Sequence, residues 1–215
     1  MKESILTYIE NGGPAIMWPL VAMFAVGLAI TAWRLVVIGM AMYSTHTLYK
    51  RIFVLLKDRD GSIQKARELC ERTSGPVATI IHSGLSRLHK GIDGVEKAVL
   101  AAGAVELAFL ENGLVWLATI VNLAPMLGFF GTVAGMIVAF QSIAAAGDVE
   151  PTIVAAGISV ALITTAGGLL VAMPMQAAYN LCVFLIDKVV VSMEENASKF
   201  IETLVDLGYD KPKAS

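Results

Sequence analysis

Charged side chains are scarce in this 215-residue sequence, where Asp, Glu, Lys and Arg make up 16% of the residues. An ordinary globular domain has about 25%. No nucleophile, base and oxyanion-stabilising group converge in any stretch, so an enzyme is the least favoured class. The sequence also lacks a basic stripe and any nucleic-acid-binding motif, which argues against nucleic acid as a partner.

Cysteine and histidine are equally rare. The two cysteines, Cys70 and Cys182, are too far apart in the sequence to indicate a disulfide framework, and we expect both to be unpaired. His82 and His89 are seven residues apart, but a zinc site needs more ligands than these two. We therefore expect no metal site and no cofactor.

What the sequence does contain is long uncharged stretches, at residues 11–33, 112–147 and 151–186. A helix crosses the hydrocarbon core of a bilayer with about 20 apolar residues. The sequence therefore predicts an all-α integral membrane protein with transmembrane helices over residues 16–41, 114–146 and 153–186. Arg34, late in the first helix, is expected to extend its side chain toward the nearer membrane surface.

The remaining segments are polar or mixed. Residues 1–15 form a short N-terminal segment, and residues 147–152 form an acidic loop. Residues 44–113 hold ten of the sixteen Lys and Arg residues and show helical periodicity, which predicts a helical domain. Its last helix, from about Val95, is expected to continue straight into the second span, with Pro125 as the one kink. Residues 187–215 form a C-terminal helix and tail.

The distribution of basic residues predicts an orientation. Residues 44–113 together with the segment after Asp187 hold fourteen Lys and Arg residues, whereas the N-terminal segment holds Lys2 and the loop at Asp148 holds none. Basic residues next to spans stay in the cytoplasm. We therefore expect the N-terminus outside, the 44–113 domain and the C-terminus in the cytoplasm, and residues 1–15 and 147–152 in the periplasm.

Polar groups inside a membrane helix mark function, because unsatisfied polarity is costly there. On a helical wheel Thr165, Gln176 and Asn180 fall on one face of the third span, and the second span offers Thr132. Neither span has an acidic residue, a lysine or a histidine at depth. A proton path would therefore need an acid from another polypeptide. Residues suited to close helix packing are Gly128, Gly131, Gly135, Gly167, Gly168 and Pro174.

Three stretches of this sequence resemble the ExbB/TolQ/MotA proton-channel family. LGFFGTVAGM at residues 127–136 is similar to the family signature LGxxGTVxGM, and GISVALITTAGGLLVAMP at residues 157–174 resembles its third-helix signature. GGPAIMWPL at residues 12–20 is similar to an ExbB-type N-terminus. The resemblance covers nearly the whole chain and is closest to ExbB, the energising subunit of the TonB system, since MotA-type stators are usually longer in the cytoplasmic part.

The resemblance implies a homopentamer in the bacterial inner membrane. It would surround the single transmembrane helices of a small ExbD/TolR-like protein, whose essential Asp would supply the missing acid. A TonB/TolA-like protein that spans the periplasm would receive the work and power outer-membrane transport. Thr132 and Thr165 match the pore-facing threonines of the family, and Pro174 matches the proline that breaks its third helix.

Two positions depart from the family pattern. Many ExbB members carry a Glu where this chain has Val160, and an acidic residue where it has Trp33, so no role of those acids transfers. Several functions remain open from the sequence: a TolQ-like subunit for envelope integrity, a MotA-like motility stator, a permease subunit, and a structural scaffold that conducts no protons.

Overall fold

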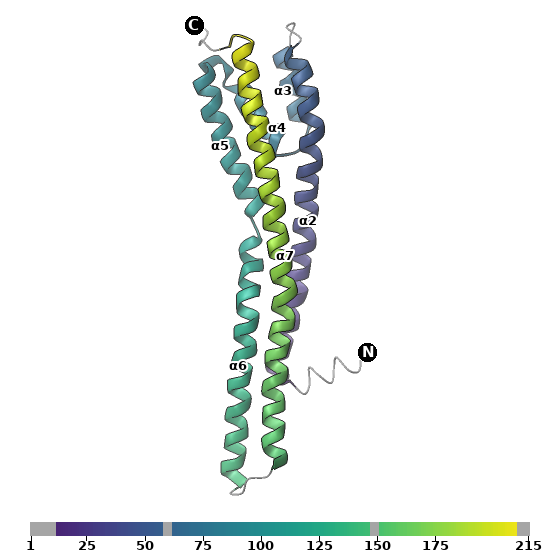
Figure 1. Ribbon diagram of the computed structural model, residues 1–215, viewed down its shortest axis with the longest axis vertical. Coiled ribbons are helices and arrows are strands. Elements are labelled where there is room, and N and C mark those ends of the chain that lie inside the picture. The colour runs from purple at the N-terminus through teal and green to yellow at the C-terminus, as the bar shows by residue number, and fades with distance from the viewer. Residues whose placement is uncertain (1–11, 58–61, 147–150, 210–215) are drawn as a thin grey trace. The chain divides into compact units, whose positions relative to one another are not determined.

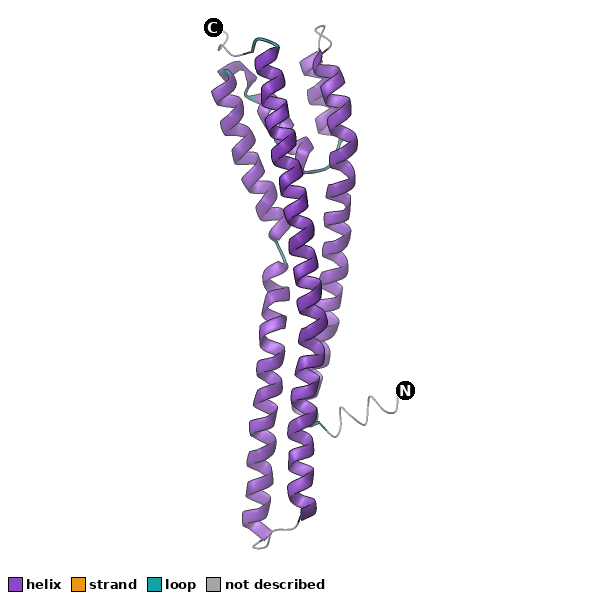
Figure 2. Cartoon of the chain, in the orientation of Figure 1, coloured by secondary structure: helices purple, strands orange, loops and turns teal. Residues whose placement is uncertain are grey.

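The computed structural model describes residues 12–57, 62–146 and 151–209, and every regular element in those ranges is helical (Figure 2). The prediction of an all-α fold is thereby confirmed. The elements in chain order (Figure 1) are the α-helices α2 (Pro14–Lys57), α3 (Ser62–Arg72), α4 (Pro76–Ser86), the short 3-10 helix η1 (Leu88–Lys90), α5 (Ile92–Glu111), α6 (Leu114–Ala146) and α7 (Pro151–Asp206).

Three helical stretches are long and apolar enough to cross a membrane, as the sequence predicted: Pro14–Tyr43, Ile92–Ala145 and Val154–Asp206. The second stretch holds 54 residues, which at 1.5 Å per residue would extend about 80 Å, far beyond a hydrocarbon core of about 30 Å. Its α5 part carries charges such as Glu96, Lys97 and Glu106, whereas α6 carries none. The α6 part is therefore the segment suited to the hydrocarbon.

The chain divides into two compact units. Unit 1 comprises residues 1–33 and 113–181, and unit 2 comprises residues 34–112 and 182–215. In unit 1 the first half of α2 packs with α6 and the first half of α7. This core consists of Met17, Leu20, Leu117, Ile120, Ala124, Val171, Ala172 and Met175.

Unit 2 packs α3, α4, α5 and the second half of α7 around aliphatic side chains. Gly84 on α4 leaves space that other elements fill: a Cβ added there would lie 2.8 Å from Phe200 and 3.0 Å from Val99. Phe200 is 1% exposed, so this aromatic ring of α7 is enclosed by α4 and α5. Other fully enclosed aliphatic side chains of unit 2 include Ile38, Ile52, Val77, Ile81, Val95, Leu110, Val189 and Leu204.

The junction between α5 and α6 corrects one prediction. The helix that starts before Val95 does not continue straight into the second span, because α5 ends at Glu111 and α6 begins at Leu114. Gly113 between them has a φ of 88°, in the left-handed region that glycine adopts without steric cost. The Asn112-Gly113 dipeptide was the available sequence signal for this interruption.

The prolines give a second correction. Pro174 was expected to break the third membrane helix, but α7 runs through it without interruption, as α6 does through Pro125 and α2 through Pro19. A proline removes one backbone hydrogen bond of the preceding turn. Neighbouring helices in a membrane protein can compensate for that loss, so the helix continues.

Arg34 is also placed differently from the prediction. Its side chain does not extend toward a membrane surface: it is 1% exposed, inside unit 2. Cys182 on α7, which is also fully buried, belongs to the same unit. The aliphatic part of the Arg34 side chain thus packs against other residues of this chain.

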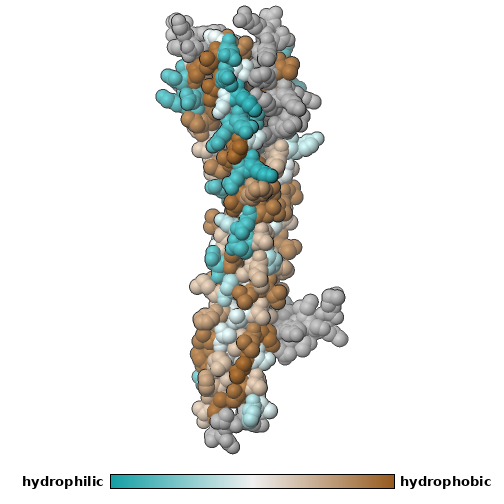
Figure 3. All heavy atoms as spheres, in the orientation of Figure 1, coloured by the Kyte–Doolittle hydropathy of each residue, from teal (hydrophilic) through white to brown (hydrophobic). Residues whose placement is uncertain are grey.

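The surface differs between the two units. Figure 3 shows hydrophilic residues gathered on unit 2, whereas the surface of unit 1 is mostly hydrophobic. Large apolar side chains of unit 1 point outward, with Phe129 68%, Phe130 60% and Leu170 68% exposed. Such a surface is costly in water and suits contact with lipid or with other membrane helices.

Candidate functional site

Helices α6 and α7 of unit 1 pack closely along a line of glycines. A Cβ added to Gly168 would lie 2.6 Å from the carbonyl oxygen of Ala124, and one added to Gly128 would lie 2.9 Å from the carbonyl oxygen of Thr164. Real Cβ atoms do not approach backbone atoms this closely, so both positions require the absence of a side chain. The two backbones therefore meet without intervening side chains, as in small-residue contacts between membrane helices.

The same line continues toward the α6 C-terminus and the α7 N-terminus. Gly131 faces the Thr164 side chain, and Gly135 faces Ala161, whose backbone nitrogen would lie 3.2 Å from an added Cβ. Gly157 faces Ala139, whose methyl group occupies the place of a Cβ on Gly157. We call the set formed by Gly128, Gly131, Gly135, Gly157 and Gly168 the glycine seam.

Gly167 lies outside the glycine seam. A Cβ added there would be 3.1 Å from the sulfur of Met17, so this glycine faces α2 and not α6. Its neighbour in the sequence, Gly168, faces α6. One step along a helix turns a residue by about 100°, which is why adjacent glycines serve different partners.

The glycine seam brings Thr132 and Thr165 together. The Thr165 hydroxyl donates a hydrogen bond across the helix pair to the carbonyl oxygen of Gly128 at 3.2 Å, and its oxygen lies 3.5 Å from that of Thr132. The Thr132 hydroxyl donates to the carbonyl oxygen of Phe129 in its own helix. Both side chains are half-buried. This hydroxyl pair is the most polar feature of the α6–α7 contact.

The hydrogen bonds of the pair decide what it can offer a ligand. A hydroxyl has one proton to donate and two lone pairs that accept. Because Thr165 and Thr132 direct their protons to Gly128 and Phe129, the lone pairs are what remains for a further partner. The pair is therefore suited to accept a hydrogen bond from a neutral acid, water or hydronium.

Thr164 packs in the contact between α6 and α7, although the sequence analysis did not identify it as a site residue. Its side chain is 0% exposed and packs on Gly131, and its hydroxyl donates to the Ala161 carbonyl at 2.8 Å. The hydroxyl is thus satisfied within α7 and the methyl group fills the space that Gly131 leaves. Thr164 is buried and Thr165 half-buried because one residue step turns a side chain by about 100° around the helix. The only sequence signal that a glycine would face Thr164 was the LGxxGTVxGM-like stretch of α6.

Gln176 and Asn180 lie elsewhere on α7. The Gln176 amide donates to the Asn180 side-chain oxygen at 2.9 Å, one helical turn away, and both side chains are exposed. They are therefore paired with each other and not with the hydroxyl pair. Pro174, two residues before Gln176, is also exposed.

Val160 lines an apolar pocket of about 450 Å³ within unit 1. The pocket lies among the N-terminal turn of α2, α6 and α7, with Ile16, Gly135 and Gly157 in its wall. A Cβ added to Gly13 would be 3.7 Å from the Val160 side chain, an ordinary van der Waals distance. The isopropyl group of Val160 is thus part of an apolar wall.

Titratable chemistry is absent from the described parts of α6, and in α7 the first charged residue is Asp187. No group of three metal-ligating side chains occurs within residues 12–57, 62–146 and 151–209. The hydroxyl pair can therefore shape a path for a proton but cannot itself carry the charge.

Comparison with known proteins gave one match. The sequence profile of the MotA/TolQ/ExbB proton channel family matches residues 72–195, which include α5, α6 with Thr132, and the part of α7 that holds Thr165. No curated protein matches the chain.

Proposed function

Because this chain belongs to the MotA/TolQ/ExbB proton channel family, we propose that it forms the wall of a proton path that the proton-motive force drives in the bacterial inner membrane. Its family and its three apolar helical spans make it a proton-channel-type membrane subunit. Within that family we propose an ExbB-type role, in which the chain energises transport across an outer membrane.

The observation that carries the proposal is the hydroxyl pair. Thr132 and Thr165 come from different helices, and the Thr165 hydroxyl lies 3.5 Å from the Thr132 oxygen, to which it can donate. Each hydroxyl oxygen has two lone pairs that can accept a hydrogen bond. The surrounding seam consists of glycines and alkyl side chains. A passing acid would meet these two oxygens as the main polar groups on an apolar wall.

The proton carrier in this proposal is the Asp of a small single-span ExbD/TolR-like partner. A carboxylate in an apolar environment pays a large desolvation cost, which raises its pKa and favours the neutral acid. A neutral carboxylic acid has a proton to donate, and the oxygens of Thr132 and Thr165 can accept it. The wall thus stabilises the protonated form more than the charged form.

The energy available is modest but sufficient to bias a movement. One elementary charge crossing 100 mV releases about 2.3 kcal/mol. Protonation from one side and release to the other would alternate the partner between a neutral form that fits the apolar wall and a charged form that does not. A partner helix that shifts or rotates between these two forms would deliver work to a TonB/TolA-like protein.

Several sequence features support the ExbB-type assignment within the family. The GGPAIMWPL stretch at residues 12–20 is similar to an ExbB-type N-terminus, and the segment between the first two spans is short for a MotA-type stator. The assembly proposed with this role is a homopentamer around the partner helices, with residues 44–113 and the C-terminus in the cytoplasm. TolQ-like and MotA-like systems remain the alternatives that the partner proteins would distinguish.

The deciding experiment replaces the Thr165 hydroxyl. Thr165→Val keeps the shape and removes the oxygen, so we expect loss of energised uptake in a strain that needs the system, and loss of proton flux into liposomes that hold the purified complex. Thr165→Ser keeps the oxygen and should retain most of the flux. Full uptake and full flux in Thr165→Val would remove the residue from the path.

Thr164→Val is the matched control, because its hydroxyl is buried and bonded within α7. The same isosteric change one residue away should leave proton flux near the wild-type level. Equal losses in both variants would indicate a packing defect in place of a role for the Thr165 oxygen. A chain that works as a scaffold alone would show no dependence of its function on the proton gradient.

A further inference from the structure

A groove between α4 and α5 in unit 2 is basic at one end. Its volume of about 690 Å³ lies within the range of about 300–1,000 Å³ that is common for small-molecule sites. Arg87, Lys90 and Lys97 line this groove, and none of its lining residues carries a carboxylate. All three basic side chains are exposed. The groove is therefore large enough for a small molecule and offers it positive charge.

The turn from α4 to α5 brings the three basic residues together. The Arg87 carbonyl oxygen accepts a hydrogen bond from the Lys90 backbone at 2.9 Å, which closes the turn. A Cβ added to Gly94 would lie 2.5 Å from the Lys90 Cβ and 3.4 Å from the Arg87 carbonyl oxygen, so the turn packs directly on the start of α5. Lys97 is three residues after Gly94, on the same helix face. The cations thus gather at the end of the groove where α5 begins.

Two other basic residues of unit 2 have an acidic partner, whereas these three do not. Arg67 lies 4.0 Å from Glu71, and Lys199 lies 3.9 Å from Glu195, each one helical turn away. Among the described residues no ion pair involves any of the three basic residues of the groove. Like charges that stand close together without such a partner repel one another. A bound anion would relieve this repulsion.

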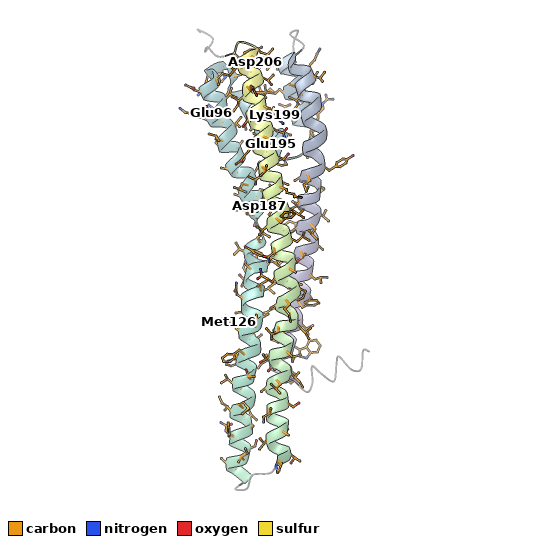
Figure 4. All side chains as sticks on the ribbon, viewed as in Figure 1. Glu96, Met126, Asp187, Glu195, Lys199 and Asp206 are labelled. Carbon is orange, nitrogen blue, oxygen red and sulfur yellow. The ribbon has the colours of Figure 1, made fainter. Side chains whose placement is uncertain are left out.

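The glutamates next to the groove engage other parts of unit 2. Glu96 directly precedes Lys97, but one residue step turns a side chain by about 100° around the helix. Glu96 accordingly lines a separate groove that α5 forms with α7, and Figure 4 shows it on α5. Glu71 on α3 lies 3.2 Å from a ring nitrogen of His82, in the wall of the basic groove. His82 is thus engaged by that carboxylate, and the three exposed cations remain for a ligand.

The rest of the groove is lined largely by small apolar side chains. Ala98, Ala101 and Ala102 form its floor on α5, and Val105 is the last lining residue along this helix. From Lys97 to Val105 the helix rises about 12 Å, at 1.5 Å per residue. A phosphate ion alone would occupy only the charged end. The apolar remainder suits a carbon chain attached to the phosphate.

We propose that this groove binds a phosphate ester, with its phosphate at Arg87, Lys90 and Lys97 and its carbon chain on the alanine floor. The Arg87 guanidinium can bind two phosphate oxygens at once, and the two lysines add positive charge. The ester comes either from an anionic phospholipid or from a soluble phosphorylated compound, since both present the same group. The inference concerns unit 2 alone and does not rest on the proposed function.

Lysine labelling of the full chain tests this site without altering it. The chain is placed in nanodiscs of phosphatidylcholine, treated briefly with an N-hydroxysuccinimide reagent and analysed by peptide mass spectrometry. We expect hexyl phosphate, at roughly four times its Kd, to slow the labelling of Lys90 and Lys97 about fivefold. Lys65, an exposed lysine on α3, should keep its rate. Nanodiscs that contain phosphatidylglycerol distinguish the two sources. Slow labelling there without added ester identifies the lipid, whereas protection by hexyl phosphate alone identifies a soluble compound.

Two pairs of variants test the charged end and the floor separately. Arg87→Gln should remove most of the protection of Lys97, whereas the same change at Arg72 on α3 should not. Ala101→Leu fills the floor, so it should weaken protection by hexyl phosphate but not by sodium phosphate. Ala104→Leu, in the groove that α5 forms with α7, is the matched control and should change neither. All four substituted residues are exposed, so the fold should tolerate these changes.

Three results would overturn the inference. The first is a labelling rate of Lys90 and Lys97 that no phosphate compound and no anionic lipid lowers relative to Lys65. The second is slow labelling of both lysines in phosphatidylcholine alone, which would mean that a protein surface covers the groove. The third is protection by sodium phosphate equal to that by hexyl phosphate, with Ala101→Leu without effect, which would show a binding site for simple anions. Lysine labelling does not report proton flow, so failure of the Thr165 experiment would leave this result unchanged.

Discussion

Gly128 on α6 and Gly168 on α7 oppose each other so closely that neither has room for a methyl group. A Cβ on Gly168 would be 3.1 Å from the Cα of Gly128, and one on Gly128 would be 3.2 Å from the Cα of Gly168. Four residues further along α6, Thr132 meets Thr165. The spacing of the hydroxyl pair is therefore set by backbone contact and not by adaptable side chains.

Gly168→Ala should separate the two helices. The added methyl group meets the carbonyl oxygen of Ala124 at 2.6 Å, and a backbone atom cannot rotate away. Overpacking of this kind costs about 1–3 kcal/mol. We expect that loss in denaturant unfolding of the detergent-solubilised chain, together with reduced proton flux.

Gly39→Ala is the control for that substitution, because nothing lies within 4 Å of a Cβ added to Gly39 in α2. Alanine is about 1 kcal/mol better than glycine inside a helix, so this variant should be as stable as the wild type or more so. Equal unfolding curves for Gly168→Ala and Gly39→Ala would contradict the close approach of α6 and α7.

Gly157 and Ala139 permit a reciprocal exchange. Gly157→Ala alone should destabilise the helix pair, since the new methyl group would lie only 2.3 Å from that of Ala139. Adding Ala139→Gly removes the opposing methyl group. We expect a favourable coupling of at least about 1 kcal/mol in a double-mutant cycle, within the range for residues in contact. Strictly additive unfolding free energies would show that the two positions do not touch.

Gln176 and Asn180 test how far the proton path extends along α7. Gln176→Leu or Asn180→Leu removes the 2.9 Å hydrogen bond between their side chains and an exposed polar group. We expect a smaller reduction of proton flux than in Thr165→Val, because neither side chain contacts the hydroxyl pair. Liposome flux measured in parallel for the three variants checks the order. Wild-type flux in both leucine variants would place the path's polar wall at Thr132 and Thr165 alone.

The sequence predicted correctly those features of the fold that depend on a single property, such as the absence of charge. Long uncharged stretches predict membrane helices because each charge at depth is costly, and the three apolar helical stretches confirm the prediction. The glycines of residues 128–135 and 167–168 were identified as packing residues, but not their partners. The spacing of residues along one helix does not say which neighbouring helix lies opposite, so the sequence could not predict that Gly167 faces α2 while Gly168 faces α6.

Cys70 gives a prediction of pH dependence. Burial in unit 2, together with the nearby Glu71 carboxylate, raises the pKa of this thiol from its ordinary 9.0 to about 11. A raised folded-state pKa means that the associated stability is fully present below pH 9 and is lost as the pH rises through 11. The loss is at most about 3 kcal/mol, at roughly 1.4 kcal/mol per pH unit.

Maleimide labelling of the folded chain follows this thiol directly. With Cys182→Ser as background, the labelling rate of Cys70 should be low at pH 7 and rise steeply between pH 9 and 11, while the unfolded chain labels rapidly from pH 8. A folded-state rate that already levels off near pH 9 would show an ordinary thiol. Unfolding of Cys70→Ala at pH 8 and pH 10.5 is the matched comparison for stability.

The wrong predictions share a physical cause, because each depended on local propensity where tertiary contacts decide. Arg34 was placed at a membrane surface since its own helix has no acid, but α7 supplies the environment that encloses it. Pro174 was expected to break α7, but the helix continues through it. The interruption at Gly113 was missed because apolar composition continues across Asn112-Gly113 and hides the turn signal.

Because α6 and residues 151–186 have no carboxyl side chains, infrared spectroscopy can distinguish a carboxyl group of a partner from those of this chain. No Asp, Glu or His occurs in residues 112–147 or 151–186, so this chain contributes no carboxyl vibration from those stretches. In an infrared difference spectrum of the complete assembly in lipid, we expect a protonated carboxyl band that exchanges slowly with heavy water to come from a different polypeptide. Labelling only this chain with carbon-13 should leave that band unshifted. The proton carrier can then be identified by isotope, without altering either protein.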